Sequence, residues 1–124
     1  AGENAVYQGD EIEVPLIEIA HARSGDKGNH SNIGVIARKA DYLPWIRAAL
    51  TEQSVASYMQ HVLDAEKGRV IRYELPGLNA LNFMLENALG GGGVASLRID
   101  PQGKAFAQQL LDMPVKVPAH LLEK

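Results

Sequence analysis

Residues 14–38 read VPLIEIAHARSGDKGNHSNIGVIAR, two apolar runs that flank a polar centre. Val14–Arg23 alternates with the period of a β-strand, which sets His21 on the same face as two isoleucines. This parity favours a buried His21, but a β-bulge would reverse it, so the orientation of His21 stays open. Asn32–Arg38 is a second β-like run. Two neighbouring strands predict an antiparallel hairpin, with residues 24–31 as an unusually long connecting loop.

The remaining sequence predicts helices and further strands around this hairpin. Helices are expected at Asp41–Leu50, from a capping Thr51 to Gly68, at Leu78–Leu89 and at Gly103–Met113. Strands are expected at Val70–Leu75 and Val94–Asp100. We therefore predict an α+β fold, a ferredoxin-like sandwich with an approximately four-stranded, mostly antiparallel sheet and helices packed on one face. The domain is expected at residues 14–118, between a flexible N-terminal segment, 1–13, and a C-terminal tail, 119–124.

Composition excludes several classes of function. The 124 residues carry 12 Lys+Arg against 15 Asp+Glu, a net charge of −3 that argues against a nucleic-acid partner, because phosphates need a basic face. The chain has no cysteine, which excludes disulfide scaffolds, thiolate metal sites and cysteine nucleophiles. Because no apolar stretch could span a bilayer and no signal pattern opens the sequence, we expect a cytoplasmic protein without a membrane partner.

The polar centre of the hairpin holds more polar groups than a turn requires. Gly25 and Gly28 would let the backbone approach a ligand and turn its N–H groups toward an anion. Arg23 could hold a carboxylate or phosphate by a bidentate fork, and Lys27 could act as a point charge. The alternative is a surface loop whose polar side chains make only local turns.

A second polar constellation follows near residue 80. Asn79 and Asn82 could orient a ligand carbonyl, and Gly90–Gly93 predict close backbone approach to a ligand. The glycine run precedes a predicted strand and fits neither the Rossmann nor the P-loop pattern, so both nucleotide-binding motifs are rejected. The alternatives are a helix C-cap for the glycines and capping of Pro76–Gly77 for the asparagines.

These two constellations define the candidate site. The candidate catalytic residues are His21, Asp26 and Lys27, with His21 or Asp26 as a general base. The candidate substrate- or anion-binding residues are Arg23, Ser24, Gly25, Gly28, Asn29, Asn32, Asn79, Asn82, Gly91 and Gly92. The histidines have no metal-ligand spacing, so we predict neither a metal nor a resident cofactor, with coenzyme A entering only as part of a substrate.

Three motifs carry a resemblance to a known family: HARSGDKG at residues 21–28, ALNF at 80–83 and GGGGVASLRID at 90–100. Over Pro15–Pro118 the chain resembles the C-terminal ferredoxin-fold domain of the acyclic terpene utilisation protein AtuA family. That domain follows a larger domain or occurs as a separate small protein beside it. The resemblance implies a ferredoxin-like fold and a setting in the catabolism of acyclic terpenoid and branched-chain acids as coenzyme A thioesters.

The resemblance and the polar residues together predict a small subunit or accessory domain of an AtuA-like catabolic enzyme. It would act on branched or terpenoid organic acids or their acyl-CoA thioesters, with the GDKG segment binding an anion. The expected partners are a larger AtuA-type chain, or further copies of this chain, and a small anionic metabolite. Two alternatives stay open, a self-sufficient small hydratase or lyase and a non-catalytic assembly module.

Overall fold

The computed structural model describes residues 11–27, 30–88 and 102–122. The strands are β1 (Glu11–Pro15), β2 (Ala20–Lys27), β3 (His30–Ala37), β4 (Arg69–Leu75), β5 (Ala80–Glu86) and β6 (Pro114–Pro118). The α-helices are α2 (Leu43–Ala49), α3 (Glu52–Tyr58) and α5 (Gln102–Leu111). Short 3-10 turns lie at Leu16–Glu18, Ala40–Tyr42, Gln60–Val62 and Ala119–Leu122.

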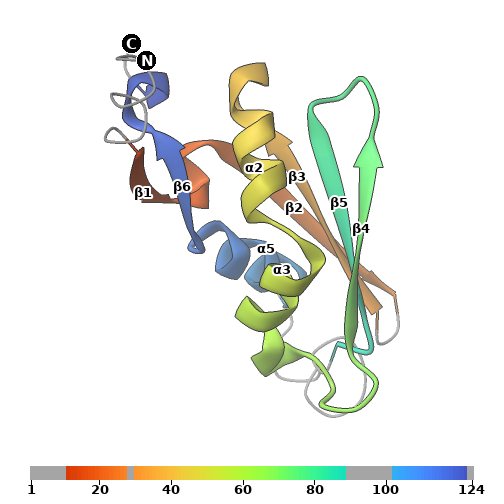
Figure 1. Ribbon diagram of the computed structural model, residues 1–124. Helices are drawn as coiled ribbons and strands as arrows, with labels where there is room; N and C mark the ends of the chain where they lie inside the picture. The colour runs from red at the N-terminus through yellow and green to blue at the C-terminus, as the bar shows by residue number, and fades with distance from the viewer. Residues whose placement is uncertain (1–10, 28–29, 89–101, 123–124) are drawn as a thin grey trace.

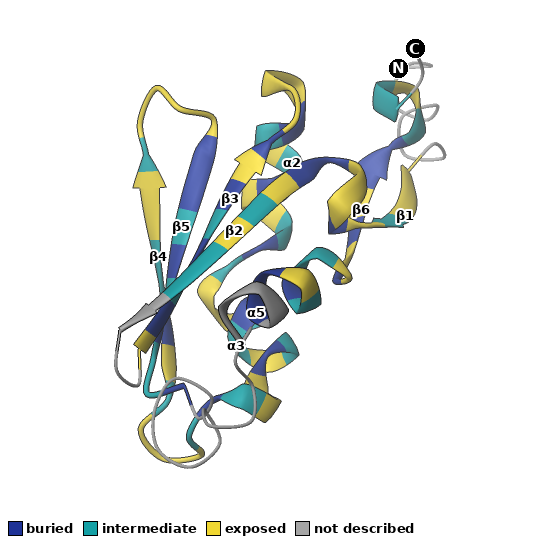
Figure 2. Ribbon diagram, turned by 180° about the vertical axis from the view of Figure 1, so that it is seen from behind, coloured by how far each residue is buried: buried dark blue, intermediate teal, exposed yellow. Residues whose placement is uncertain are grey.

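The central element is an antiparallel sheet with the strand order β2-β3-β5-β4. The described helices all lie on one side of this sheet, as Figures 1 and 2 show from opposite directions. The two hairpins, β2–β3 and β4–β5, therefore stand side by side, and the helical layer packs across them. The α+β class, the four-stranded antiparallel sheet and the helices on one face are confirmed.

Alternate side chains of the central strands form the floor of the core. The larger ones are fully buried or 1% exposed, and of the residues next to them in sequence only Ala80, at 6%, is also buried, as expected for a sheet with one covered face. The inward set from β3 and β5 comprises Ile33, Val35, Leu81, Phe83 and Leu85. The helices close the same core cluster with Ile46, Val55, Phe106 and Leu110.

A second, two-stranded ribbon joins the ends of the domain. In it β1 pairs antiparallel with β6, with Val14 opposite Val115. Residues 11–13, assigned above to a flexible segment, are the first residues of β1, and the tail contains the last 3-10 turn. The hydroxyl of Tyr42 donates to the carbonyl of Leu121 at 3.1 Å, which ties this turn to the helical layer.

Several local predictions are confirmed. Helix α2 lies within Asp41–Leu50 with Pro44 in its first turn, and β4 and α5 occupy the predicted segments. Thr51 caps α3, because its hydroxyl accepts from the backbone N–H of Ser54 at 3.0 Å. The helix after Thr51, however, ends at Tyr58 rather than at Gly68 and continues as a 3-10 turn.

The predicted helix at Leu78–Leu89 is wrong, because its central residues form β5. Gly77 and Asn79 have positive φ angles of 81° and 51°, so residues 76–79 turn the chain back and β5 pairs with β4. Leu81 and Leu85, two of the leucines that match a helical period, also point to the same, inward face when the segment is a strand. Because this segment pairs with both β3 and β4, it forms a strand and not a helix. The predicted strand at Val94–Asp100 lies outside the described residues.

The predicted long loop at residues 24–31 is also wrong. Strand β2 continues through Lys27 and β3 begins at His30, so only two residues connect them. Gly25 pairs with Asn32 in this ladder. Polar residues are compatible with these strand ends because one face of the sheet is open to solvent.

Truncation of neighbouring side chains in β5 tests the strand assignment. Phe83 is fully buried and Met84 projects to the opposite face, so Phe83→Ala should lower the free energy of unfolding by about 3–5 kcal/mol. Met84→Ala should cost about 1 kcal/mol or less. Urea denaturation measures both, and Phe83→Leu serves if Phe83→Ala does not fold. Equal losses at residues 83 and 84 would contradict the one-sided core.

Candidate functional site

The sheet face opposite the helices is not covered by any described element (Figure 2). Strand alternation and the ladder register place polar and apolar side chains together on this face. These outward side chains are His21 and Arg23 from β2, Asn32 and Ile36 from β3, Asn82 and Met84 from β5, and Tyr73 from β4. We call this surface the open face.

His21 lies on the open face, so of the two orientations that the sequence left open the structure shows the exposed one. The 3-10 turn at Leu16–Glu18 interrupts the alternation before β2 starts, so Ile19 is fully buried while His21 is exposed. The His21 Nε2 atom lies 3.4 Å from a terminal guanidinium nitrogen of Arg38. His21 is therefore available to solvent or to a ligand, beside a fixed positive charge.

A recess of about 540 Å³ lies beside β2, an edge strand of the sheet. Three basic side chains border it, those of His21, Arg23 and Arg38. Its remaining lining is Ile17, Ala20, Ala22, Ile36 and Leu111. We call it the β2 recess. Basic groups beside an aliphatic lining suit a ligand with an anionic end and an apolar chain.

The arginines of the β2 recess are available for an anion. Arg38 is held in place because its Nε–H donates to the carbonyl of Ile17 at 2.9 Å. Within the described part of the chain, neither Arg23 nor Arg38 has a carboxylate at salt-bridge distance. A bound carboxylate would therefore not have to displace an internal ion pair among these residues.

Two asparagines of the candidate site meet at the centre of the open face. The Asn32 side-chain amide donates to the Asn82 side-chain oxygen at 3.0 Å, a bond between β3 and β5. Asn82 lies opposite Gly34 on one side and Tyr73 on the other. The hydrogen bond fixes the orientation of both amides, so they form a polar patch in the middle of the sheet.

Gly34 leaves a hollow between this patch and Arg23, which is its partner on β2. A Cβ added at Gly34 would lie 3.8 Å from the Asn82 side-chain oxygen and 4.0 Å from the Arg23 carbonyl, which is ordinary contact. Packing within the chain therefore does not require glycine here. A glycine inside a strand weakens it and often marks close approach by a ligand or another backbone.

Ser24 belongs to the helical face rather than to the open face. Its hydroxyl is half-buried and accepts from the backbone N–H of Ala107 at 3.1 Å, which joins β2 to α5. Ser24 is thus placed as a structural contact, away from His21 and Arg23. The structure does not bring it together with the other predicted binding residues.

Asn79 is separated from the asparagine patch along the sheet. It occupies the β4–β5 turn, and its carbonyl accepts from the backbone N–H of Ala37 at 2.9 Å. This end of β3 is opposite the one that carries Asn32, so Asn79 does not join Asn32 and Asn82. Its positive φ angle and backbone bond give it a role in the turn.

The GDKG segment is described only in part. The backbones of Asp26 and Lys27 belong to β2 and lie opposite Ser31 and His30. The side chains of residues 26 and 27, and the whole of Gly28, Asn29, Gly91 and Gly92, lie outside the description. Their assignment to the site stays a prediction.

Sequence reasoning missed Arg38. It follows β3, and its backbone N–H donates to the carbonyl of Ile19 at 2.9 Å across the hairpin. A hairpin register carried to its end would have placed it next to the start of β2 and therefore near His21. The cluster of His21, Arg23 and Arg38 can be predicted only from the pairing of β2 with β3.

The described residues were compared with two further requirements, those of a metal site and of a membrane-spanning helix, and they meet neither. Among them, no group of three or more His, Cys, Asp or Glu is arranged to hold a metal ion. In the same segments, no helix is both long and apolar enough to cross a membrane.

Comparison with protein families gives one assignment. A family model described as the AtuA ferredoxin-like domain matches residues 14–116. The chain belongs to this family. The match includes β2, β3, β4 and β5 and so every residue of the open face, and it confirms the resemblance and the ferredoxin-like fold. Comparisons with curated proteins and with solved structures gave no match.

A pair of glycine variants tests whether Gly34 is needed by the chain itself. Gly34→Ala should leave the free energy of unfolding unchanged or raise it by up to about 1 kcal/mol, because the new methyl group has room. Gly68→Ala is the matched control, since its Cβ would lie 2.6 Å from the Asp64 carbonyl oxygen and should destabilise by about 1–3 kcal/mol. Urea denaturation measures both. A large loss at Gly34 would contradict an open hollow.

Proposed function

We propose that the chain is a small subunit or accessory domain of an AtuA-like catabolic enzyme. It would act on branched or terpenoid organic acids or their acyl-CoA thioesters, in the cytoplasm that a cysteine-free sequence favours. The observation that carries this proposal is the β2 recess, where basic groups border an aliphatic lining. Membership of the AtuA ferredoxin-like domain family supports the choice of enzyme.

The β2 recess has separate parts for the two ends of such a ligand. The guanidinium groups of Arg23 and Arg38 can pair with a carboxylate through charge-assisted hydrogen bonds. Ile17, Ile36 and Leu111 offer the other end an aliphatic surface, and Ile17 and Ile36 are 43% and 42% exposed. Covering that surface with a branched chain removes apolar area from water and stabilises the complex.

His21 is the candidate that can move a proton at this place. Its imidazole borders the β2 recess, and a histidine can accept or donate a proton near neutral pH. In the proposed site His21 serves a hydration or elimination step next to the bound carboxylate or thioester. Asp26 and Lys27 follow on the same strand and complete the proposed catalytic set.

The larger AtuA-type chain is the proposed partner, and the open face is the surface that suits it. Tyr73 and Ile36 are 48% and 42% exposed there, beside the hollow at Gly34. A sheet is normally buried by another layer, and apolar side chains exposed together are typical of interfaces. A partner on this face would also shield the β2 recess from water. A non-catalytic assembly module is the second candidate, favoured by the same uncovered surface.

Removal of one recess charge tests anion binding. Isovalerate, a small branched carboxylate, should bind the isolated chain weakly, and Arg23→Gln should weaken this binding about three- to tenfold by deleting a charge-assisted contact. NMR titration of the backbone amides of β2 measures the affinity. Arg69→Gln is the control, because Arg69 pairs with Glu86 at 3.6 Å and does not line the recess. Equal losses for both variants would reject a specific recess.

Co-expression tests the subunit assignment. A larger AtuA-type chain should co-purify with this chain in a fixed ratio by native mass spectrometry. Tyr73→Asp should weaken the complex at least tenfold, as expected for an aromatic interface residue. Ile12→Asp is the control, since Ile12 is 41% exposed but lies on β1. A homo-oligomer that is active without the larger chain would favour the self-sufficient hydratase or lyase instead.

A further inference from the structure

His21 and Arg38 meet at the border of the β2 recess, and their contact determines which imidazole nitrogen carries a proton. A terminal nitrogen of the Arg38 guanidinium lies 3.4 Å from His21 Nε2, in hydrogen-bond geometry. A guanidinium carries five N–H donors and no acceptor, and it stays protonated in proteins. Nε2 is therefore the acceptor in this bond, which requires a lone pair on that atom.

The guanidinium of Arg38 is held at this place by bonds to the segment that leads into β2. The backbone N–H of Arg38 donates to the carbonyl of Ile19, and its side-chain Nε–H donates to the carbonyl of Ile17, both at 2.9 Å. Both ends of the arginine are thereby tied to the same short stretch of backbone. A side chain that is already ordered loses little further conformational entropy when it contacts His21.

Because Nε2 holds a lone pair, the proton of neutral His21 lies on Nδ1. In a neutral imidazole one nitrogen is a donor and the other an acceptor, and the bond made by one nitrogen fixes the state of the other. A doubly protonated ring would turn an N–H and a positive charge toward the guanidinium. We infer that Arg38 is a positioning residue that holds neutral His21 with its proton on Nδ1.

The nitrogen of His21 that is left for a ligand is Nδ1. Among the described residues, this atom has no hydrogen-bond partner. The pair therefore offers a ligand donors only, the Nδ1–H of His21 and the remaining N–H groups of Arg38. A neutral imidazole N–H can polarise a carbonyl group. The role in the site rests on the proposed function: there the contact selects a hydrogen bond from Nδ1 to an oxygen of the carboxylate or thioester, rather than proton acceptance at Nε2.

Two histidines of the chain give opposite predictions, so a single spectrum carries its own control. His30 Nδ1 accepts from the backbone N–H of Asn87 at 3.1 Å, so the proton of neutral His30 lies on Nε2. Long-range proton–nitrogen NMR, at a pH where the imidazoles are neutral, distinguishes protonated from unprotonated nitrogens. We expect Nδ1–H for His21 and Nε2–H for His30, with signals assigned through His21→Gln and His30→Gln. An Nε2–H form of His21 would overturn the inference.

Variants of Arg38 separate this contact from the general charge of the recess. Arg38→Met should lower the ratio of Nδ1–H to Nε2–H at His21 about two- to tenfold, as expected for the loss of one hydrogen bond. Arg38→Lys should restore part of the ratio, because an ammonium also only donates. Arg23→Gln is the matched control and should leave the ratio unchanged, since Arg23 borders the recess but no hydrogen bond joins it to His21 among the described contacts. An unchanged ratio in Arg38→Met, or an equal fall in Arg23→Gln, would overturn the role of Arg38.

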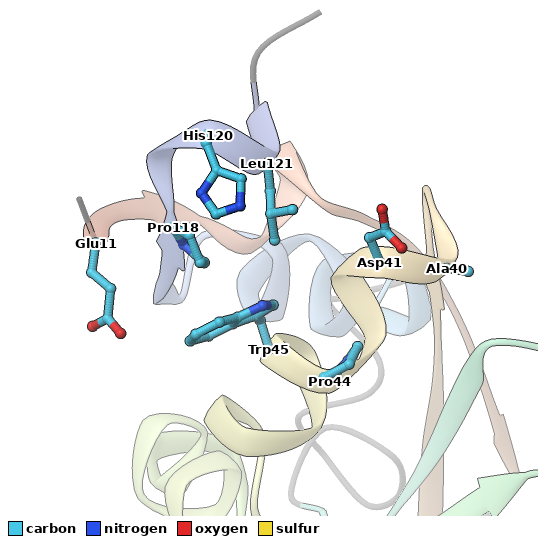
Figure 3. Close-up of a pocket in the computed structure, with 8 residues that line it drawn as sticks. All are labelled: Glu11, Ala40, Asp41, Pro44, Trp45, Pro118, His120 and Leu121. Carbon is cyan, nitrogen blue, oxygen red and sulfur yellow. The ribbon is translucent and has the colours of Figure 1, made fainter. Parts of the chain in front are cut away.

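Addition of isovalerate tests the ligand separately from the proton position. It should shift the Nδ1 signal of His21 but not the ring signals of His120, which borders a different groove beside Trp45 and Leu121 (Figure 3). That groove shares no lining residue with the β2 recess. If Nδ1 carries the proton but isovalerate does not bind, the proposed function is rejected and the role of Arg38 stands. If isovalerate binds while Nε2 carries the proton, the proposed function stands and the role of Arg38 is rejected.

Discussion

The pairing of β3 with β5 is the constraint on which the other features of the structure depend. Ile33 lies opposite Phe83 on the buried side, and this register fixes Gly34 opposite Asn82 on the open face. Because side chains alternate, a slip by one residue would exchange the two faces. Burial of the aromatic ring at Phe83 therefore also determines where the asparagine patch and its hollow lie. Stability and the candidate site are set by the same ladder.

The helical layer is attached to the sheet by polar as well as apolar contacts. The polar contacts described below lie on the helical side of the sheet and do not involve the open face. Arg72 of β4 donates from one terminal nitrogen to the carbonyls of Arg47 and Leu50, at 2.8 and 3.0 Å, at the end of α2. A positive charge at a helix C-terminus is favourable because the last carbonyls lack helical partners. Glu52 accepts from the backbone N–H of Arg72 at 2.8 Å and ties α3 to the same strand. The described helices thus hold one side of the sheet, and none of the described residues forms a layer on the other side.

The sequence predicted those elements whose signals are local. Pro44 near the start of α2 and the Thr51 cap of α3 are short-range features, and both are confirmed. The segment around Phe83 was ambiguous because its leucines fit a helical as well as a strand period, and only pairing with β3 and β4 resolves it. The orientation of His21 could not be read from strand parity, because a single 3-10 turn before β2 shifts the alternation of the residues after it. The approach of Arg38 to His21 depends on the hairpin register, which a pattern within one strand does not contain.

Gly34 belongs both to the β3 ladder and to the candidate site on the open face. Inside a central strand, a glycine gives up both conformational entropy and side-chain contacts, and the neighbouring atoms leave room for a methyl group. The packing of the chain therefore provides no reason for glycine at this position. On the open face, a side chain at this position would lie between Arg23 and Asn82. A backbone or ligand that approached Gly34 would reach the basic groups of β2 and the paired amides together, as the anionic substrate proposed above would need.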